Sequence, residues 1–252
     1  MLRILEEIGH FAYFSYKSLL VLPASLLNPR ETTRQFYRIL IGALPLGLVA
    51  GLAIGLVLWM QLRGPLVRTA GKEAIPYLPT AVALAVVLEF APIGAGLIVA
   101  GRTGASLGAE LGAMRLTEQI DALESMGQSS MKRLIGPRVL ACMLALPLLT
   151  IFIAVLAILA AFAAEMLTGT ITSLQYEMNT WNGLRMEDVV PSVLKTLFFG
   201  FVTGVSGCYF GMKAQGGTEG VGHAATRGVE LSTLLVLIAN VLLVRLIQLL
   251  IP

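Results

Sequence analysis

The chain has 252 residues, of which 56% are hydrophobic and 13% are charged, and its mean hydropathy is +0.82. These values exclude a soluble globular domain and indicate a polytopic membrane protein. The formal net charge of +3 comes from basic residues spread along the chain, as is usual for membrane insertion, and we expect no nucleic-acid partner. Two cysteines and two histidines provide neither a disulfide framework nor a metal-binding spacing, so we expect no metal site.

The first 22 residues carry apolar side chains at three- and four-residue spacing, as at Leu5 and Ile8, with charged residues elsewhere on the helical wheel. This pattern predicts an amphipathic helix in the membrane interface. Pro23 and then Pro29 are expected to break it. A basic connector to the first span follows: Arg30, Arg34 and Arg38. Residues 1–30 are therefore predicted to form the interfacial helix and the start of its connector.

Five predominantly apolar runs are each long enough, at about 1.5 Å per residue, to cross a hydrocarbon layer about 30 Å thick. We predict transmembrane spans at residues 39–60, 78–101, 139–164, 192–212 and 229–251. The remaining stretches are predicted as a polar loop at 61–77, a polar segment at 102–138, a mixed loop at 165–191 and a glycine-rich connector at 213–228. The predicted fold is thus an all-α polytopic membrane protein, a single domain over residues 1–252.

The first span contains a row of glycines at four-residue spacing, Gly47, Gly51 and Gly55. Residues four apart lie on one face of a helix, and small residues there allow a second helix to approach closely. The row therefore predicts a helix–helix or subunit interface.

Glu89 lies in the middle of the second predicted span. An ionisable residue at this depth costs about 2.5–3.5 kcal/mol on insertion scales, so it should face protein, water or a cavity. Pro92, Gly94 and Gly96 follow within two turns and are expected to loosen the helix. Two interpretations stay open: a carboxyl that lines a functional cavity, and a carboxyl that is protonated or bonded to a neighbouring helix.

The polar segment 102–138 separates two apolar runs and must reach water at one membrane face. Apolar residues at helical spacing predict one or two amphipathic helices parallel to the membrane plane. Gly127 is a plausible helix end, and a basic stretch leads from there to Pro137. Periodicity alone does not distinguish a docking element from a solvated linker.

Basic residues predict the orientation of the chain. Twelve of the 18 Lys and Arg residues precede the first span, lie in segment 102–138 or lie in the connector 213–228. By the positive-inside rule, the N-terminus, this segment and this connector are expected in the cytoplasm, and the C-terminus is expected on the periplasmic side.

The polar segment also carries a long motif. The sequence ELGAMRLTEQIDALESMG at 110–127 is preceded by AGRTGASLGA at 100–109 and followed by PRVLACMLALPLLT at 137–150. This combination resembles the signature of the MlaE-type permease family, the membrane subunits of ABC lipid transporters that work with substrate-binding proteins of the mammalian-cell-entry (MCE) type. The resemblance extends to the layout of nearly the whole chain, which would be a single permease domain.

This resemblance implies a cytoplasmic coupling helix, over residues 104–127, that docks on a separate ABC ATPase. The residues implied for docking are Glu110, Arg115, Glu118, Gln119, Asp121 and Glu124. It also implies a homodimer in the bacterial inner membrane, an MCE-type partner in the periplasm, and a phospholipid or similar lipid as cargo. No cofactor is expected on this chain, because ATP and Mg would be bound by the partner ATPase.

The family's usual R-E-L-G-P motif near the lipid pocket corresponds here to Leu88-Glu89-Phe90-Ala91-Pro92, which keeps the glutamate and the proline but not the arginine. The lipid cavity implied by the resemblance would involve Glu89, Pro92, Gly51, Gly55 and Leu88.

No nucleotide-binding loop of the G-x-x-x-x-G-K-[ST] kind is present, so we expect a non-catalytic subunit. Three other classes of protein are the alternatives. A proton-coupled secondary transporter could use Glu89, but no internal repeat is visible. An intramembrane enzyme would need further catalytic groups at membrane depth. A non-transporting scaffold could recruit cytoplasmic proteins through segment 102–138.

Overall fold

A computed structural model describes residues 2–26 and 28–250, with side-chain surroundings for 5–26 and 28–249. Its elements are α1 (Leu2–Leu26), α2 (Pro29–Ala70), η1 (Lys72–Tyr77), α3 (Leu78–Ala85), η2 (Val86–Phe90), α4 (Ala91–Val99), η3 (Ala100–Gly104), α5 (Ala105–Leu116), α6 (Gln119–Ser125), η4 (Met131–Ile135), α7 (Gly136–Thr168), α8 (Ser173–Gly183), α9 (Met186–Met212) and α10 (Gly217–Leu250). Here η1 is a 3₁₀-helix, and η2, η3 and η4 are π-helical. The described residues contain no strand, which confirms the all-α fold class.

Within the described ranges, five helical stretches are long and apolar enough to cross a membrane. They are Pro29–Ala70, Lys72–Leu116, Met131–Thr168, Met186–Met212 and Gly217–Leu249. Each contains one of the predicted spans, except that the last predicted span ends at residue 251. Residue 251 lies outside the described residues, as do residues 1, 27 and 252. The helices extend beyond the apolar runs because helical hydrogen bonding continues where the chain leaves the lipid.

Several predicted breaks are wrong. α1 continues through Pro23 and ends three residues later. Pro29 is the first residue of α2, where its missing N–H is no loss, and the predicted basic connector forms the first turns of that helix. The predicted loop 61–77 is largely helical, as α2 and η1, and the predicted connector 213–228 is mostly the start of α10.

The chain divides into two compact units. Unit 1 comprises residues 1–43, 96–146 and 197–242, and unit 2 comprises 44–95, 147–196 and 243–252.

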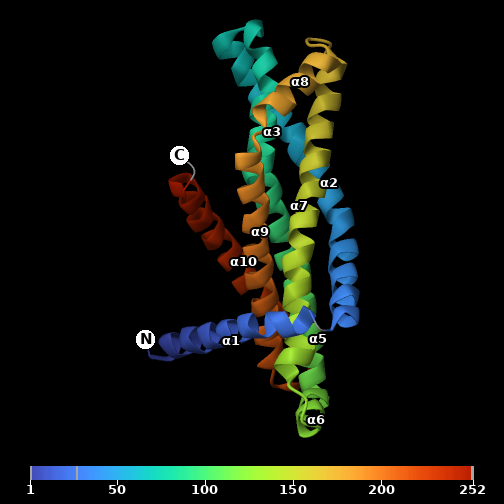
Figure 1. The fold of residues 1–252 in the computed structure, drawn as a ribbon, viewed down its shortest axis with the longest axis vertical. Helices are drawn as coiled ribbons and strands as arrows, with labels where there is room; N and C mark the ends of the chain where they lie inside the picture. The colour runs from blue at the N-terminus through green and yellow to red at the C-terminus, as the bar shows by residue number, and fades with distance from the viewer. Residues whose placement is uncertain (1, 27, 251–252) are drawn as a thin grey trace. The chain divides into compact units, whose positions relative to one another are not determined.

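In unit 1, α1 lies crosswise to α9 (Figure 1). The rings of Phe11 and Phe14 meet Tyr209 edge-on, with centroid distances of 5.2 and 5.4 Å. Such aromatic pairs add about 0.5–1.5 kcal/mol to the burial itself. Farther along α1, Ser25 is fully buried and packs close to Gly136, so that a Cβ on this glycine would overlap the serine hydroxyl. These contacts fix α1 on the helices of this unit.

Glycines also let three elements of unit 1 cross at short range. A Cβ on Gly207 of α9 would lie 3.0 Å from Gly104 O, and a Cβ on Gly228 of α10 would lie 2.8 Å from the same oxygen. The distance at Gly228 is shorter than a real Cβ contact with backbone, and the distance at Gly207 is tighter than most such contacts, so both positions favour glycine. Small residues at helix crossings are the usual way in which membrane helices pack closely.

In unit 2, α8 is a helix that the sequence analysis assigned to a loop. Its N-terminus is capped by Thr172, whose hydroxyl accepts a hydrogen bond from Gln175 N at 3.4 Å. Asn179 connects α8 to the start of the second span. Its side-chain Nδ2 donates to Pro76 O at 2.8 Å, and its backbone carbonyl accepts from Thr80 Oγ1 at 2.7 Å. Burial, with a smaller effect of the Glu165 carboxylate, raises the pKa of Tyr176, so this phenol stays neutral.

Candidate functional site

A charged pair lies within unit 2. Lys195 Nζ in α9 is 3.2 Å from Glu89 Oε1 in η2, and the two side chains are 2% and 36% exposed. Glu89 lies 11 residues after the start of α3, about 16 Å along the helix, which is half the thickness of a hydrocarbon layer. Pairing offsets part of the cost of charges at this depth.

Pro92 explains why Lys195 binds here. Proline has no N–H to donate to the carbonyl one turn earlier, so the helix before it is π-helical and leaves two carbonyls without a backbone donor. Lys195 Nζ donates to Leu88 O at 2.6 Å, and Ser192 Oγ donates to Val87 O at 2.5 Å. The neighbouring helix α9 therefore satisfies the carbonyls that the proline frees.

The pair borders a pocket of about 130 Å³ within unit 2. It is lined by Leu88, Glu89, Glu187, Asp188, Ser192, Lys195, Val244, Ile247 and Gln248. The pocket thus combines three carboxylates and one ammonium with apolar side chains from α10. A small ligand with both charged and apolar parts would match this lining.

The other residues predicted for a lipid cavity lie elsewhere. Gly51 and Gly55 of α2 pack against α7, where an added Cβ would lie 2.8 Å from Ile153 O at Gly51 and would overlap Ala157 O at Gly55. Pro92 is buried in α4 and does not line the pocket. Of the five predicted cavity residues, the pocket brings Glu89 and Leu88 together and leaves out the other three.

The predicted coupling helix consists of two helices in unit 1, α5 and α6, which meet at Glu118. This residue has a φ of 56°, and among the described residues it is the single non-glycine residue with a positive φ. A left-handed conformation costs a residue with a side chain about 1–2 kcal/mol. Gly127 ends α6 with a φ of 73°, as predicted, and Gln128 N donates to Leu123 O at 3.2 Å in the usual C-terminal motif.

The tip, which we define as residues 116–127, exposes most of the predicted docking residues. Those exposed are Glu118, Gln119, Asp121 and Glu124, while Arg115 is partly exposed and pairs with Asp121 across the turn. Glu124 Oε1 accepts a hydrogen bond from Ser130 Oγ at 2.6 Å. Fully buried Ile120 holds α6 in place, whereas Leu116 and Met126 are 46% and 67% exposed. The tip therefore presents acidic and apolar groups together.

Glu110 is separate from the tip. Its carboxylate receives Arg138 Nη2 at 2.7 Å and Arg38 Nη1 at 3.1 Å, and its side chain is 30% exposed. These two ion pairs join α5 to α7 and α2 within unit 1. The arrangement gives Glu110 a role in holding α5 beside the membrane-spanning helices.

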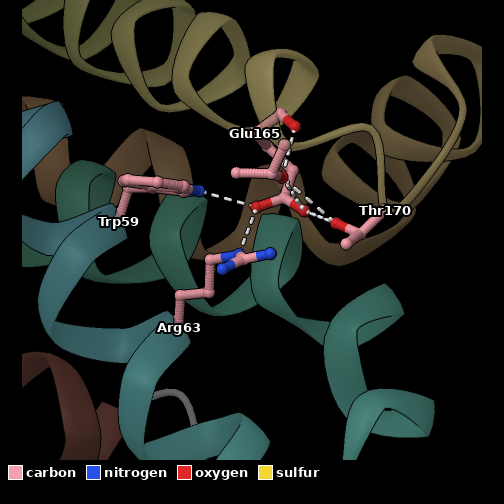
Figure 2. A network of polar contacts seen from close by, with 5 residues as sticks. Trp59, Arg63, Glu165 and Thr170 are labelled. Atoms are coloured by element: carbon pink, nitrogen blue, oxygen red, sulfur yellow. Dashed lines mark hydrogen bonds and ion pairs between the residues drawn. The ribbon is translucent and has the colours of Figure 1, made fainter.

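A second carboxylate of unit 2, Glu165, lies near the end of α7. Figure 2 shows Trp59 and Arg63 of α2 directed at Glu165, which is fully buried. Trp59 Nε1 donates to Glu165 Oε2 at 2.6 Å, Arg63 Nε lies 3.2 Å from the same oxygen, and Thr170 Oγ1 donates to Oε1. Both oxygens of the carboxylate therefore have hydrogen-bond donors, as a buried charge requires. The sequence predicts a loop at this residue, because the apolar run ends at 164.

Comparison with known proteins identifies the family to which the chain belongs. The sequence matches the family described as Permease MlaE over residues 32–246. A probable ABC transporter permease protein of Rickettsia typhi is 32% identical over 98% of this chain and 94% of that protein. The chain belongs to the MlaE permease family. A probable ABC transporter permease protein of Synechocystis is 30% identical over 85% of the chain and 80% of its own length. The chloroplastic protein TRIGALACTOSYLDIACYLGLYCEROL 1 of Arabidopsis thaliana is 34% identical over 64% of the chain and 46% of its own length.

As an MlaE-family permease, the chain is a multi-pass membrane subunit of the ABC type, a class that works with an ATPase. The motif around Glu89 has leucine at 88, where the resemblance led us to expect an arginine. The structure supplies a cation to this glutamate from Lys195, 106 residues later in the chain. The sequence signal for this partner is one basic residue, Lys195, within the apolar run 192–212.

The permease carries no group of three or more His, Cys, Asp or Glu side chains arranged to hold a metal ion within residues 2–26 and 28–250. Both cysteines, Cys142 and Cys208, are buried thiols. In a membrane protein such residues behave as small hydrophobic side chains.

Proposed function

We propose that this MlaE-family permease moves a phospholipid or a similar lipid between the inner membrane and an MCE-type periplasmic partner. A separate ATPase, docked on the coupling segment, would supply the energy. The N-terminus and the tip would be cytoplasmic and the C-terminus periplasmic, as the distribution of basic residues favours.

The observation that carries this proposal is the Glu89–Lys195 pair beside a pocket with an apolar wall. A phospholipid needs polar groups for its head and apolar surface for its chains. The carboxylates of Glu187 and Asp188 would attract an amine where the head group has one, and Val244 and Ile247 would contact the apolar part of the lipid. The name of the Arabidopsis relative refers to a galactolipid, which also favours a lipid as cargo.

The tip supports the docking part of the proposal. Exposed carboxylates around exposed Leu116 and Met126 are the composition expected of a helix pair that fits a groove on a soluble protein. ATP-driven closure of the partner would move the tip and change the lipid site. Such coupling requires that the two shapes of the site bind lipid with different free energies.

We also propose that the permease acts as a homodimer in which α2 and α10 frame the lipid path. These are the least buried of the five spans, with 28% and 17% of their most apolar windows buried. The apolar side chains that these two spans leave exposed contact either lipid or another protein.

The test is to purify the full chain from its native membrane in mild detergent, identify co-purifying proteins and bound lipids by mass spectrometry, and repeat this with Glu89→Leu. The proposal expects an ATPase, an MCE protein and phospholipid with the native chain, and altered lipid but unchanged ATPase with the variant. Arrival of the native chain alone and free of lipid, also after gentler extraction, would contradict it and favour a proton-coupled transporter that uses Glu89.

A further inference from the structure

A pocket of about 1160 Å³ lies within unit 1, between the start of α2 and the residues that lead into α7. Two stretches of sequence about 100 residues apart form it, 28–38 and 128–138, together with Glu110 and Met114. Its basic lining residues are Arg30, Arg34, Arg38, Lys132, Arg133 and Arg138. Two carboxylates, Glu31 and Glu110, face these six cations, which leaves a formal surplus of four positive charges.

Most of this charge is not neutralised within the protein. Arg38 and Arg138 share Glu110. The structure gives no ion pair or hydrogen bond to the side chains of the other four cations, Arg30, Arg34, Lys132 and Arg133, in the described parts of the chain, and all four are exposed. Like charges that converge in one pocket repel each other, so the arrangement favours an anionic ligand.

The position of α2 indicates the depth of the pocket in the membrane. Arg30, Arg34 and Arg38 follow each other at four-residue spacing along one face of the helix. The uncharged run 39–60 starts directly after them, and Tyr37, 65% exposed, lies at the same boundary, where aromatic residues favour the interface. The pocket therefore lies at the level of the lipid head groups in the leaflet where α2 begins.

The backbone adds to this electrostatic character. α2 starts inside the pocket at Pro29, and the first turns of a helix present free N–H groups and the positive end of the helix dipole. Arginine side chains at head-group depth bind phosphate through paired N–H donors. The positive-inside rule requires basic residues on one side of the membrane. It does not require that basic residues from two distant segments line the same pocket.

We propose that this pocket binds the phosphate group of an anionic phospholipid in the leaflet where α2 begins. The site is separate from the proposed transport pocket, because it lies in unit 1 and shares no residue with it. Because Arg38 and Arg138 also hold Glu110, a bound phosphate competes with Glu110 for these cations. Binding of lipid would thereby change how firmly α5 is held.

The test measures binding of short-chain phosphatidylglycerol, and of phosphatidylcholine with the same chains, to the purified full-length chain by native mass spectrometry. Arg30→Gln, Arg34→Gln and Arg133→Gln are combined in one variant. The matched control combines Arg68→Gln, Lys72→Gln and Arg185→Gln, which removes the same charge from exposed residues that do not line the pocket. We expect the pocket variant to bind phosphatidylglycerol on the order of a hundredfold more weakly, and the control variant to bind as the native chain does.

Inorganic phosphate distinguishes the two sources of the group. A lipid site binds phosphatidylglycerol much more tightly than free phosphate, and high phosphate displaces it. Equal affinity for free phosphate and phosphatidylglycerol, or for the two lipids, would overturn the proposal. Loss of a co-purifying ATPase from the pocket variant, with lipid binding unchanged, would also overturn it and assign the surface to the partner.

Two further measurements keep the proposal testable if the glutamine variant does not fold. Replacement of the same three arginines by lysine keeps the charge and should retain the preference for phosphatidylglycerol. Binding to the native chain should weaken as salt concentration rises, because phosphate contacts by cations are screened. Salt-independent binding would contradict a phosphate site.

Discussion

Lys195 Nζ bridges Glu89 Oε1 and Leu88 O, and so joins α9 to the π-helical turn that Pro92 imposes on the second span. One ammonium group therefore compensates two defects in an apolar span, a carboxylate and a carbonyl without a backbone donor. Removal of the ammonium takes a donor from both groups at once. The two members of this pair should consequently respond differently to mutation.

We predict that Lys195→Met destabilises the protein by about 1–3 kcal/mol, since it takes a charged hydrogen-bond donor from a carboxylate and a carbonyl at once. Glu89→Gln should cost less, because the amide oxygen still accepts from the ammonium and the side chain is partly exposed. Glu89→Gln should also recover part of the loss in the double variant. Thermal unfolding in detergent measures this, and additive losses in the double variant would argue against a coupled pair.

The Glu165 network should be less tolerant. Glu165→Leu leaves the Arg63 guanidinium and the Trp59 indole N–H without their acceptor, and we predict a loss of about 3–5 kcal/mol. Trp59→Phe removes one donor from a carboxylate that keeps others, so a loss of about 1–2 kcal/mol is expected. Denaturant or thermal unfolding distinguishes the two. Equal losses would mean that Glu165 does not depend on its ion pair.

These two carboxylates show how far the sequence leads. The spans were predictable, because the hydrophobicity that inserts a helix is a local property of the chain. The interior position of Glu89 followed from the same apolar run. The environment of Glu165 did not, because its burial depends on Trp59 and Arg63 more than 100 residues earlier.

Helix ends and partners were harder to predict for the same reason. Pro23 predicts a helix break, and the basic stretch after Pro29 predicts a connector, but packing against the rest of unit 1 keeps both regions helical. In the coupling segment, Leu116 and Ile120 are four residues apart, the spacing of one face of a continuous helix. The turn at Glu118 instead separates them, so that Ile120 is buried and Leu116 is exposed.

The tip offers a test of ATPase docking. Glu118→Lys with Glu124→Lys reverses two exposed charges and should abolish co-purification of the ATPase while the permease stays folded. Leu116→Ser with Met126→Ser should weaken the complex about tenfold or more, because apolar anchors contribute most at such interfaces. The control is Glu73→Lys with Glu177→Lys, exposed carboxylates on η1 and α8. Unchanged ATPase recovery with both tip variants would contradict docking at the tip.

The glycine row of α2 provides a matched pair within one helix. A Cβ on Gly55 would overlap the backbone of Ala157 in α7, whereas a Cβ on Gly64 has no atom within 4 Å. We predict that Gly55→Ala destabilises the protein by about 1–3 kcal/mol, because backbone cannot move aside as a side chain can. Gly64→Ala should change stability by less than about 1 kcal/mol, since the better helix propensity of alanine is offset by the steric restriction that Pro65 places on the residue before it. Thermal unfolding of both variants in the same detergent is the measurement. Equal melting temperatures would show that α2 and α7 do not pack closely at Gly55, and the glycine row would then be free to contact another subunit.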